Sequence, residues 1–472
     1  MAAGARNRLI ALVFVFIVFS AWLTWPAENT GLGDFTTGDR RTTWLDSENS
    51  RASTTNGDYS EAPKGQAPVT EGVQLDVETR IPGDAVAHGF TLFERLYLRG
   101  GTFFVVTSNT TAFPHREHIL SRPVKLSEHN DPTDKELQFI SPDDARTTLG
   151  SNPIPMDGLT VFIYDVDFLR HLYHWWGEIL LGFWRIYSKL ETTNASKLDA
   201  PRRFVVPFTT DEEWRDAYQM DAVLMRAAFP NSPIEASGFW RDLHDLNRTV
   251  MFERAAVINR AAAHRHSLGG KWFKMIGSTQ TVEVKEGFWR PVRESVVKNI
   301  LGYFPVEWTG KGGRRKPVVT YISRQQGSRR KLADNAHDRL VDALKKLEEE
   351  GLCEVNVVNM ETLQLRDQVA LLAKTTIVIG VHGNGLTHLL WMPPSQSSAV
   401  IEIFNPGGYL FDYEILARNT GHKHYGIWND RVLSYPQGKY YEGGSLDDAE
   451  FQGVNIPVDG ETVAKIVRER LA

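Results

Sequence analysis

The sequence predicts an α/β protein whose two doubly wound halves face each other across a cleft. From residue 317 to residue 428, apolar β-branched segments alternate with segments of helical periodicity. This alternation is typical of a parallel sheet with helices on both faces. A glycine-rich turn at residues 380–388 follows one of the strands. Because such sheets bind ligands beyond the carboxyl ends of their strands, we expect a ligand site at this turn.

The N-terminus has the pattern of a membrane anchor followed by a lumenal stem. Residues 9–25 are almost wholly apolar, and Arg6 and Arg8 precede them. The length lies at the lower limit for a spanning helix, and the basic flank predicts a cytoplasmic tail over residues 1–8. A cleaved signal peptide is the alternative. Residues 26–85 are rich in small polar and acidic residues and are predicted to be a disordered stem.

The overall composition is that of a globular protein with room for two domains or more. The chain has 472 residues, a net charge of −5 and one cysteine, Cys353. The charge gives no electrostatic basis for nucleic-acid binding. One cysteine excludes a disulfide within the chain and a cysteine-based zinc site, and we expect Cys353 to be buried in a strand. Sequons at Asn109, Asn194 and Asn247 agree with a secretory route.

The first globular half is expected at residues 86–309. Runs of β-branched and aromatic residues predict its strands, and longer periodic segments predict its helices. Strands are expected at residues 102–107, 159–164, 203–208 and within 249–258, and helices at 168–190 and 211–228.

The second half, residues 310–472, has clearer signals because each apolar run is bounded by turn residues. We expect its last helix to be able to pack against the first half. Strands are expected at residues 317–323, 354–358, 376–379, 399–404 and 424–428, and helices at 335–350, 362–374, 409–419 and 461–471.

Charged residues suited to a phosphorylated ligand follow or interrupt the strands of the second half. Arg324 comes directly after a strand, and Arg329 and Arg330 follow in a loop. Guanidinium groups match phosphate oxygens bidentately, although a solvated basic loop is the alternative. Glu402 lies within an apolar strand, where a carboxylate is costly unless it is paired or functional. A ribose diol would be a suitable partner, and an exposed strand face is the alternative.

The glycine-rich turn is a second candidate for phosphate binding. Glycine lets the backbone approach a phosphate closely, and a helix that begins after the turn presents N–H groups to an anion. A tight buried turn is the alternative. The candidate residues of this turn are Gly380, His382, Gly383, Asn384, Gly385, Leu386 and Thr387.

Residues 171–178 carry the candidate for proton transfer in the first half. His171, His174 and Glu178 are spaced to share one helix face. Either His174 hydrogen-bonded to Glu178 or Glu178 itself could act as a general base. Three ligands on one helix are poor evidence for zinc. We expect the aromatic side chains of residues 173–187 in the core, with a stacking wall for a sugar as the alternative.

For two other groups of residues, metal binding is one of the interpretations that the sequence allows. Asp165 and Asp167 follow a predicted strand, where they could bind a divalent metal and a nucleotide diphosphate. The alternative is a helix cap with an acidic neighbour. The histidines of residues 264–266 and 422–424 are expected in loops or at the surface rather than on a metal.

Taken together, these motifs resemble glycosyltransferase family 61. Residues 380–388 read GVHGNGLTH and are similar to the family signature GxHGAGLTN. Glu178 stands for the family's usual Asp, Asn384 for Ala and His388 for Asn. The other similar segments are residues 321–324 with Arg329, Arg330 and Asn335 (its YISR and RR element), 361–372 (a helix), 400–404 (a strand) and 171–178 (its NYYHWLLD element).

The resemblance implies a GT-B-like fold of two Rossmann-like domains, inverting transfer from a nucleotide sugar, and a type II anchor. Residues 86–309 would hold the acceptor, with His174 or Glu178 as the base. Residues 310–472 would hold the nucleotide sugar. By the resemblance, Arg324 and Arg330 would hold the diphosphate, and Arg329 would assist them. Residues 383–386 would approach it, His382 and Thr387 would line the pocket, and Glu402 would face the nucleoside.

We therefore predict a lumenal inverting glycosyltransferase of the Golgi or endoplasmic reticulum membrane. It would move xylose or N-acetylglucosamine from a UDP-sugar to a hydroxyl of a glycan or glycoprotein, without an essential metal and without a nucleic-acid partner. One alternative is a metal-dependent, GT-A-like transferase that uses Asp165 and Asp167. The other is a membrane-anchored glycan-binding protein without activity.

Overall fold

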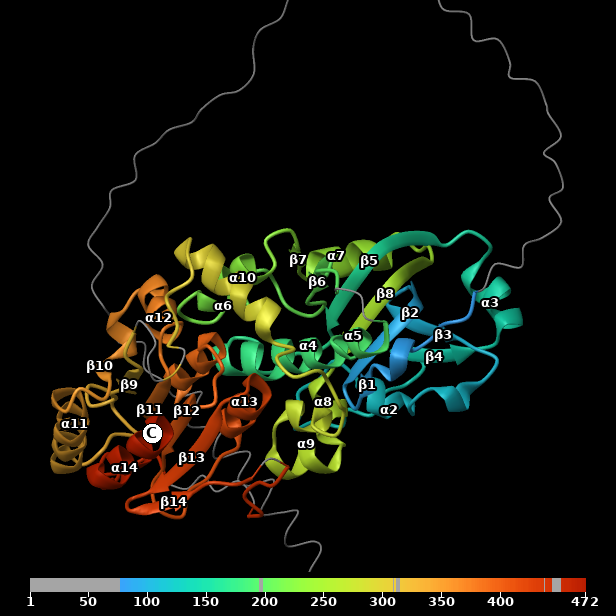
Figure 1. The fold of residues 1–472 in the computed structure, drawn as a ribbon. Coiled ribbons are helices and arrows are strands. Elements are labelled where there is room, and N and C mark those ends of the chain that lie inside the picture. The colour runs from blue at the N-terminus through green and yellow to red at the C-terminus, as the bar shows by residue number, and fades with distance from the viewer. Residues whose placement is uncertain (1–76, 195–197, 309, 311–314, 437, 444–450) are drawn as a thin grey trace, which may run out of the picture. The chain divides into compact units, whose positions relative to one another are not determined.

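The computed structural model describes residues 77–472 except 195–197, 309, 311–314, 437 and 444–450 (Figure 1). Residues Val77–Ala472 form one compact unit. The predicted tail and anchor, most of the predicted stem and the end of the sequon at Asn194 lie outside the described residues. Within the described part of the chain, no helix is long and apolar enough to span a membrane.

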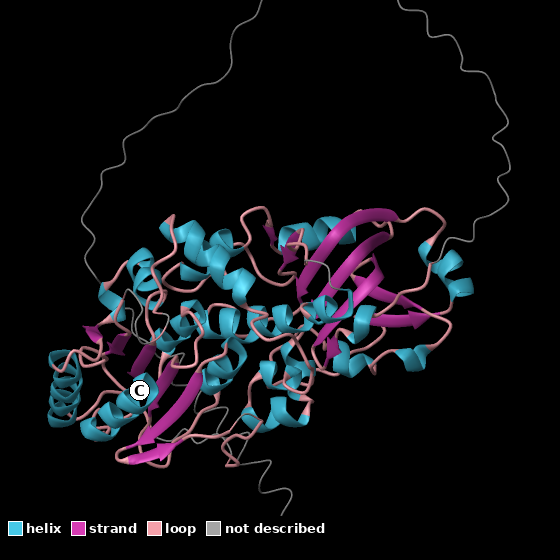
Figure 2. Ribbon diagram, in the orientation of Figure 1, coloured by secondary structure: helices cyan, strands magenta, loops and turns pink. Residues whose placement is uncertain are grey.

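The first sheet is built from residues 86–258. Its strands are β1 (Val86–Ala87), β2 (Phe90–Arg99), β3 (Thr102–Val106), β4 (Leu137–Ile140), β5 (Ile154–Ile163), β6 (Arg203–Val205), β7 (Ile234–Glu235) and β8 (Val250–Ile258). The strand order is β4-β3-β2-β8-β5-β6-β7, with β1 beside β2 (Figures 1 and 2). Strand β2 runs antiparallel to β1, β3 and β8, and the other pairs are parallel.

This first sheet is mixed, whereas the sequence predicted a doubly wound parallel sheet in both halves. One antiparallel connection is the turn from β2 to β3, where Gly100 and Gly101 have φ values of 55° and 81°. Tight hairpin turns need positive φ, so two adjacent glycines favour an antiparallel hairpin at this point. The strands that the sequence predicted near residues 102, 159, 203 and 250 are confirmed, and β2 was missed.

The second sheet is Rossmann-like, as predicted. Its strands are β9 (Val318–Ile322), β10 (Glu354–Val358), β11 (Ile377–Val381), β12 (Ala399–Ile403), β13 (Lys423–Trp428) and β14 (Arg431–Leu433). They follow the order β10-β9-β11-β12-β13-β14 and are parallel up to β13, while β14 is antiparallel. Gly380 in β11 pairs with Ile322 on one side and with Glu402 on the other. The predicted ligand residues therefore lie on adjacent strands.

Helices surround the two sheets and connect their strands (Figure 2). In the first half they are η1 (Pro82–Asp84), η2 (Thr110–Ala112), α2 (Arg116–Ile119), α3 (Pro142–Leu149), the π-helix η3 (Tyr173–Leu180), α4 (Leu181–Tyr187), α5 (Lys189–Asn194), α6 (Met220–Ala228), α7 (Ser237–Asp245), α8 (Arg260–His264), α9 (Ser267–Trp272), η4 (Met275–Thr279) and α10 (Arg290–Leu301). In the second half they are α11 (Asp334–Glu349), η5 (Met360–Thr362), α12 (Leu365–Leu372), η6 (Asn384–Trp391), α13 (Asp412–Thr420) and α14 (Gly460–Leu471).

Two predicted helices of the first half start later than expected, and each follows a residue with positive φ. The helix expected from residue 168 begins as η3 at Tyr173, after Phe168 with φ 61°. The helix expected from residue 211 begins as α6 at Met220, after Gln219 with φ 59°. A left-handed residue other than glycine interrupts a right-handed helix, and periodicity alone does not reveal it.

The last helix, α14, packs against α11 of its own half, so the expected packing against the first half is wrong. A Cβ at Gly460 would lie 2.7 Å from the carbonyl oxygen of Arg339 in α11. The apolar residues Val463 and Val467 of α14 share a core with Leu340 and Leu344 of α11. The contact needs a residue without a side chain at the start of α14.

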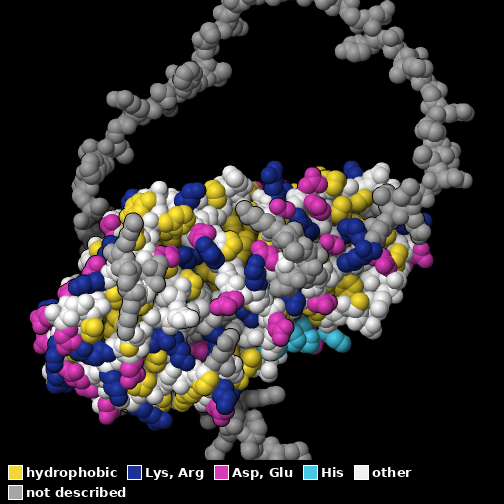
Figure 3. Space-filling model, viewed as in Figure 1, with side chains coloured by type: hydrophobic (Ala, Val, Ile, Leu, Met, Phe, Trp, Pro, Cys, Tyr) yellow, Lys and Arg dark blue, Asp and Glu magenta, His cyan; other side chains and the backbone are white. Residues whose placement is uncertain are grey.

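The largest apolar core joins the two sheets and contains the aromatic residues of η3 and α4. Trp176 in η3 lies 5.3 Å from Trp391 in η6, measured between ring centroids. The aromatic side chains of residues 173–187 are all buried, as predicted, so they form no stacking wall for a sugar. Cys353 is buried too, immediately before β10. On the face drawn in Figure 3, basic and acidic side chains are interspersed.

Candidate active site

The structure brings together the two candidates for proton transfer, which both lie on η3. His174 Nδ1 is 2.6 Å from Glu178 Oε2. The side chain of Glu178 is completely buried, whereas 18% of the His174 side chain is exposed. His174 is therefore the member of the pair that a substrate can reach, and Glu178 lies behind it.

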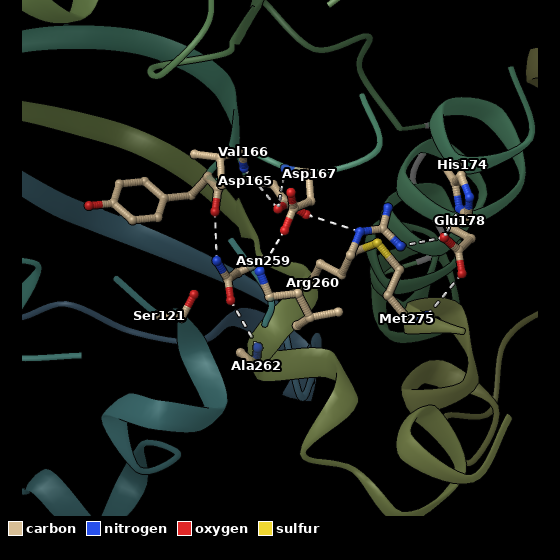
Figure 4. Close-up of polar contacts among 12 residues, drawn as sticks. Ser121, Asp165, Val166, Asp167, His174, Glu178, Asn259, Arg260, Ala262 and Met275 are labelled. Carbon is tan, nitrogen blue, oxygen red and sulfur yellow. Dashed lines mark hydrogen bonds and ion pairs between the residues drawn. The ribbon is translucent and has the colours of Figure 1, made fainter. Parts of the chain in front are cut away.

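A buried arginine contacts the same oxygen of Glu178 as His174 does (Figure 4). Arg260, at the start of α8, places Nη1 2.5 Å from Glu178 Oε2 and Nε 3.4 Å from Asp165 Oδ2. The other oxygen of Glu178 accepts a hydrogen bond from the backbone N–H of Met275 at 3.1 Å. Asp165, Arg260, Glu178 and His174 thus form a continuous chain of polar contacts in the order named.

These contacts define the protonation of the pair. Burial alone would raise the pKa of Glu178, but Arg260 and His174 outweigh it and hold that pKa well below its usual range. Burial lowers the pKa of His174, against the opposing effect of Glu178. A carboxylate only accepts hydrogen bonds, so His174 Nδ1 carries the proton and Nε2 keeps a free lone pair. This is the form of histidine that can accept a proton.

Asp165 and Asp167, the residues of the metal-binding alternative, are engaged by protein groups. Asp165 Oδ1 accepts hydrogen bonds from the N–H groups of Val166 and Asp167 at 2.9 and 3.2 Å. Asp167 Oδ2 accepts one from the N–H of Leu126 at 2.6 Å. Among the described residues, no group of three or more His, Cys, Asp and Glu side chains is arranged to hold a metal ion. A small pocket beside these two residues is also lined by Arg260.

On the second sheet, Arg324 lies against the backbone of the glycine turn. Arg324 follows β9 and Gly383 follows β11, and these strands are neighbours. A Cβ at Gly383 would clash with Arg324 Nη1 and lie 3.0 Å from its Cζ. Gly383 has φ 162°, which any residue can adopt, so the glycine is needed for space. Arg324 Nε is buried without a hydrogen-bond partner among the described residues.

The rest of the turn packs closely and leads into η6, which begins at Asn384, within the turn rather than after it as expected. Thr387 Oγ1 donates a hydrogen bond of 3.2 Å to Asn384 Oδ1. A Cβ at Gly380 would lie 3.2 Å from Leu386 Cδ2, and one at Gly385 would lie 3.3 Å from Ile322 Cγ2. Leu386 and Thr387 are buried. The turn is therefore a close-packed structure, buried except at Asn384 and Gly385, which are half-buried.

The two arginines after Arg324 differ in their relation to the turn. Arg330 has φ 54°, and its N–H donates to the carbonyl of Gln452 at 3.3 Å. Its charge lies close enough to His382 to contribute to a lowered pKa there, after the larger effect of burial. Arg329 is half-buried, and no contact of its side chain with the turn is seen. The structure thus brings Arg324 and Arg330, more than Arg329, to the turn.

Glu402 is buried between two histidines. Its Oε1 lies 2.5 Å from His382 Nδ1 and its Oε2 lies 2.8 Å from His424 Nε2. Burial raises the pKa of Glu402 well above its usual range. Both carboxylate oxygens are occupied, so Glu402 makes the direct ribose contact expected from the sequence only if one histidine moves. The expectation of a loop or surface position is wrong for His424, which is buried in β13, whereas His422 lies in the loop before β13 but is buried there too.

Helix α13 connects the two groups of candidate residues. Asp412, at its start, forms an ion pair of 3.0 Å with Lys274 of the first half. The ring of Tyr413 lies 5.7 Å from that of Tyr173 and 5.2 Å from that of His382. Together with Arg260, these residues were missed in the sequence. No local motif marks them, because each partner comes from a distant segment and only the fold brings the partners together.

Comparisons with known proteins agree with the resemblance seen in the sequence. A family model described as Glycosyltransferase 61 matches residues 172–401. The match includes His174, Glu178, Arg324 and the glycine turn, and it ends one residue before Glu402. The resemblance to that family is confirmed over these residues.

Three curated relatives carry the description EGF domain-specific O-linked N-acetylglucosamine transferase. The protein of Drosophila melanogaster is 35% identical over 140 residues, which are 29% of this chain and 24% of that protein. Those of Bos taurus and Mus musculus are 37% identical over 151 and 146 residues, 32% and 30% of this chain and 26% of each relative. The chain therefore spans about a quarter of the length of the curated relatives it matches.

Proposed function

We propose that this chain, which resembles glycosyltransferase family 61 over residues 172–401, moves a sugar from a UDP-sugar to a hydroxyl of a glycoprotein. The observation that carries the proposal is the contact of Arg324 with the backbone of Gly383. It leaves Arg324 Nε buried beside the start of a helix, without a hydrogen-bond partner in the part of the chain that the structure describes. Guanidinium groups and helix N-termini both favour phosphate oxygens.

In this proposal the second sheet binds the donor. Arg324 and Arg330 neutralise the diphosphate, and the backbone around Gly383 and Asn384 approaches it. Preorganised positive groups at the leaving group are usually the largest electrostatic contribution to such a reaction. His382 lines the nucleoside side, and Glu402 orients His382 through the hydrogen bond of 2.5 Å. The diphosphate needs no metal to leave, because the protein supplies the positive charge.

His174 is the proposed general base, with Glu178 as a positioning residue. The acceptor oxygen forms a bond to the anomeric carbon from the face opposite to the diphosphate. The bond from that carbon to the diphosphate oxygen breaks, and its electron pair leaves with UDP. The acceptor proton passes to His174 Nε2, while Glu178 stabilises the imidazolium through Nδ1 at 2.6 Å. Attack from the opposite face inverts the anomeric centre.

The relatives favour N-acetylglucosamine over xylose as the donor sugar, because N-acetylglucosamine is the sugar in their descriptions. Asn384 and His388 differ from the family signature, and substitutions at these two residues would show whether they select the donor sugar. The proposal also includes a GT-B-like pairing of two domains and a lumenal site. It places a type II anchor at residues 9–25, in the membrane of the Golgi or endoplasmic reticulum.

Titration of the protein with UDP tests the proposal. Unaltered protein is expected to bind UDP, and Arg324→Ala to bind it about tenfold or more weakly, since hydrogen bonds to charged groups are worth roughly 1.5–3 kcal/mol. Arg431→Ala is the matched control, because Arg431 is an exposed arginine on β14. Absence of UDP binding, or binding indifferent to Arg324→Ala, contradicts the proposal.

Chelation distinguishes the proposed function from the metal-dependent alternative. Transfer that persists in excess chelator supports the proposal. Loss of transfer on chelation, together with loss in Asp165→Ala and Asp167→Ala, supports the alternative site. Glycan binding without UDP binding would support the non-catalytic alternative.

A further inference from the structure

Phe168 is a strained and partly exposed aromatic residue beside the candidate base. It lies between β5 and η3 with φ 61°, a conformation that is an outlier for a bulky residue. Residues in such conformations cluster at functional sites, because the surrounding structure must hold them there. Leu169, the next residue, is buried and anchors the segment.

The strained backbone places the ring of Phe168 between two members of the polar chain. The ring centroid lies 4.8 Å from that of His174, and Arg260 Cζ lies 5.1 Å from it. The cation–π contact with Arg260 fixes the ring. The residue remains 38% exposed, while the aromatic side chains that follow it in η3 and α4 are buried. Phe168 is thus the aromatic surface next to His174 that a substrate can touch.

We propose that Phe168 is an acceptor-binding residue that contacts the carbon skeleton of the acceptor side chain, with the methyl group of a threonine as its best partner. This proposal rests on the proposed function, in which the acceptor hydroxyl donates to His174 Nε2. The carbon that bears that hydroxyl must then lie beside His174. A threonine carries its methyl group on the same carbon, within reach of a ring adjacent to His174.

A protein acceptor fits this surface better than a glycan does. Stacking of an extended glycan uses several exposed rings, and the neighbouring rings at Tyr173, Trp175 and Trp176 are in the core. A single half-exposed ring is suited to one small apolar group. Burial of one such group changes an equilibrium roughly fourfold, so threonine should be preferred to serine by about that factor.

The experiment measures transfer from UDP-N-acetylglucosamine to a folded EGF domain with one acceptor threonine, and to the same domain with serine at that position. It compares the unaltered chain with Phe168→Ala, Phe168→Gly and Phe168→Tyr. Phe304→Ala is the control, because Phe304 is an exposed phenylalanine on another segment. Phe168→Gly relieves the backbone strain, so it separates loss of the ring from loss of folding.

The unaltered chain, Phe304→Ala and Phe168→Tyr should prefer threonine roughly fourfold in kcat/KM. Phe168→Ala and Phe168→Gly should lose the preference and raise the KM for the acceptor, with the KM for the donor unchanged. An unchanged ratio in both variants overturns the assignment and leaves the proposed function intact. If the unaltered chain transfers to no acceptor, the proposed function is wrong and this assignment with it.

Discussion

At the scale of single residues, the proposed proton transfer depends on the different roles of His174 as the base and Glu178 as its positioning residue. The sequence placed the two on one helix face and left either as the base. The structure buries Glu178 completely against Arg260 and leaves His174 partly exposed. The partner that decides between them, Arg260, is 82 positions from Glu178 in the sequence. No spacing rule connects them, so the sequence alone left the choice open.

Glu178→Gln tests whether Glu178 acts through His174. The variant removes the charge that selects the His174 tautomer, so kcat should fall roughly 100-fold or more, in the range of general acid–base catalysis. His174→Ala should cost as much, and the double variant little more, because the two residues act as a unit. The measurement is kcat for UDP release, with UDP affinity and thermal unfolding as controls. Full activity in either single variant would contradict the assignment.

The acid side of the pH–rate profile gives a second test of His174. The base must be unprotonated to accept a proton, so activity should be lost as pH falls through the pKa of His174. Burial lowers that pKa below the ordinary 6.5, so activity should persist to a pH lower than an exposed histidine would allow. The measurement is kcat between pH 5 and 8, with unfolding monitored at each pH. A loss centred above 6.5 would contradict the assignment.

At the scale of elements, the glycine turn shows what sequence patterns predict well. Strands β9, β11 and β12 were predicted because β-branched runs are bounded by turn residues. The turn itself was recognised by its glycines. What the sequence did not reveal is which glycine needs the space, because that depends on Arg324, which approaches from the neighbouring strand end.

A pair of substitutions in the turn separates these roles. A Cβ at Gly383 would meet the flexible end of Arg324, so Gly383→Ala should fold normally but displace the guanidinium and weaken UDP binding about tenfold. A Cβ at Gly385 would lie 3.3 Å from Ile322 Cγ2 and 3.6 Å from Met360 Cγ but would not meet Arg324, so Gly385→Ala should bind UDP nearly as the unaltered chain does. Calorimetry with UDP and thermal unfolding measure both effects. Equal affinities in the two variants would contradict the proposed role of Gly383.

Three buried histidines, one directly after β11, one directly before β13 and one within β13, make the stability of the molecule sensitive to acid. Burial lowers the pKa of His382, His422 and His424 to about 3 each. Unfolded histidines titrate near 6.5, so below that pH the unfolded chain binds more protons and the free energy of unfolding falls. Glu402, whose pKa is raised, acts in the opposite direction but is one group against three.

Urea unfolding at pH 7.5 and pH 5 measures this sensitivity. Each buried histidine contributes up to about 1.4 kcal/mol per pH unit, so the unaltered chain should be less stable at pH 5. His422→Gln can keep the contact with Ser398 without titrating, and its loss of stability should be smaller. His129→Gln, at an exposed site, should behave as the unaltered chain does. An equal pH dependence in His422→Gln would contradict this account.

At the scale of the whole molecule, the proposed reaction needs both sheets. The first supplies the base and the second the donor site, and α13 connects them through Asp412 and Tyr413. The two α/β halves were predicted, but the mixed order of the first sheet and the packing of α14 on α11 were not. Both depend on glycines, at residues 100, 101 and 460, whose role is set by tertiary contacts or by φ rather than by periodicity.

The most direct test of the central claim is acceptor-dependent release of UDP by the full chain, screened over a panel of nucleotide sugars. We expect release from a UDP-sugar, foremost UDP-N-acetylglucosamine. Arg324→Ala should lose it through weakened UDP binding, and His174→Ala should lose it with UDP binding unchanged. Release that is equal in both variants and the unaltered chain, or consumption of no nucleotide sugar at all, would contradict the central claim.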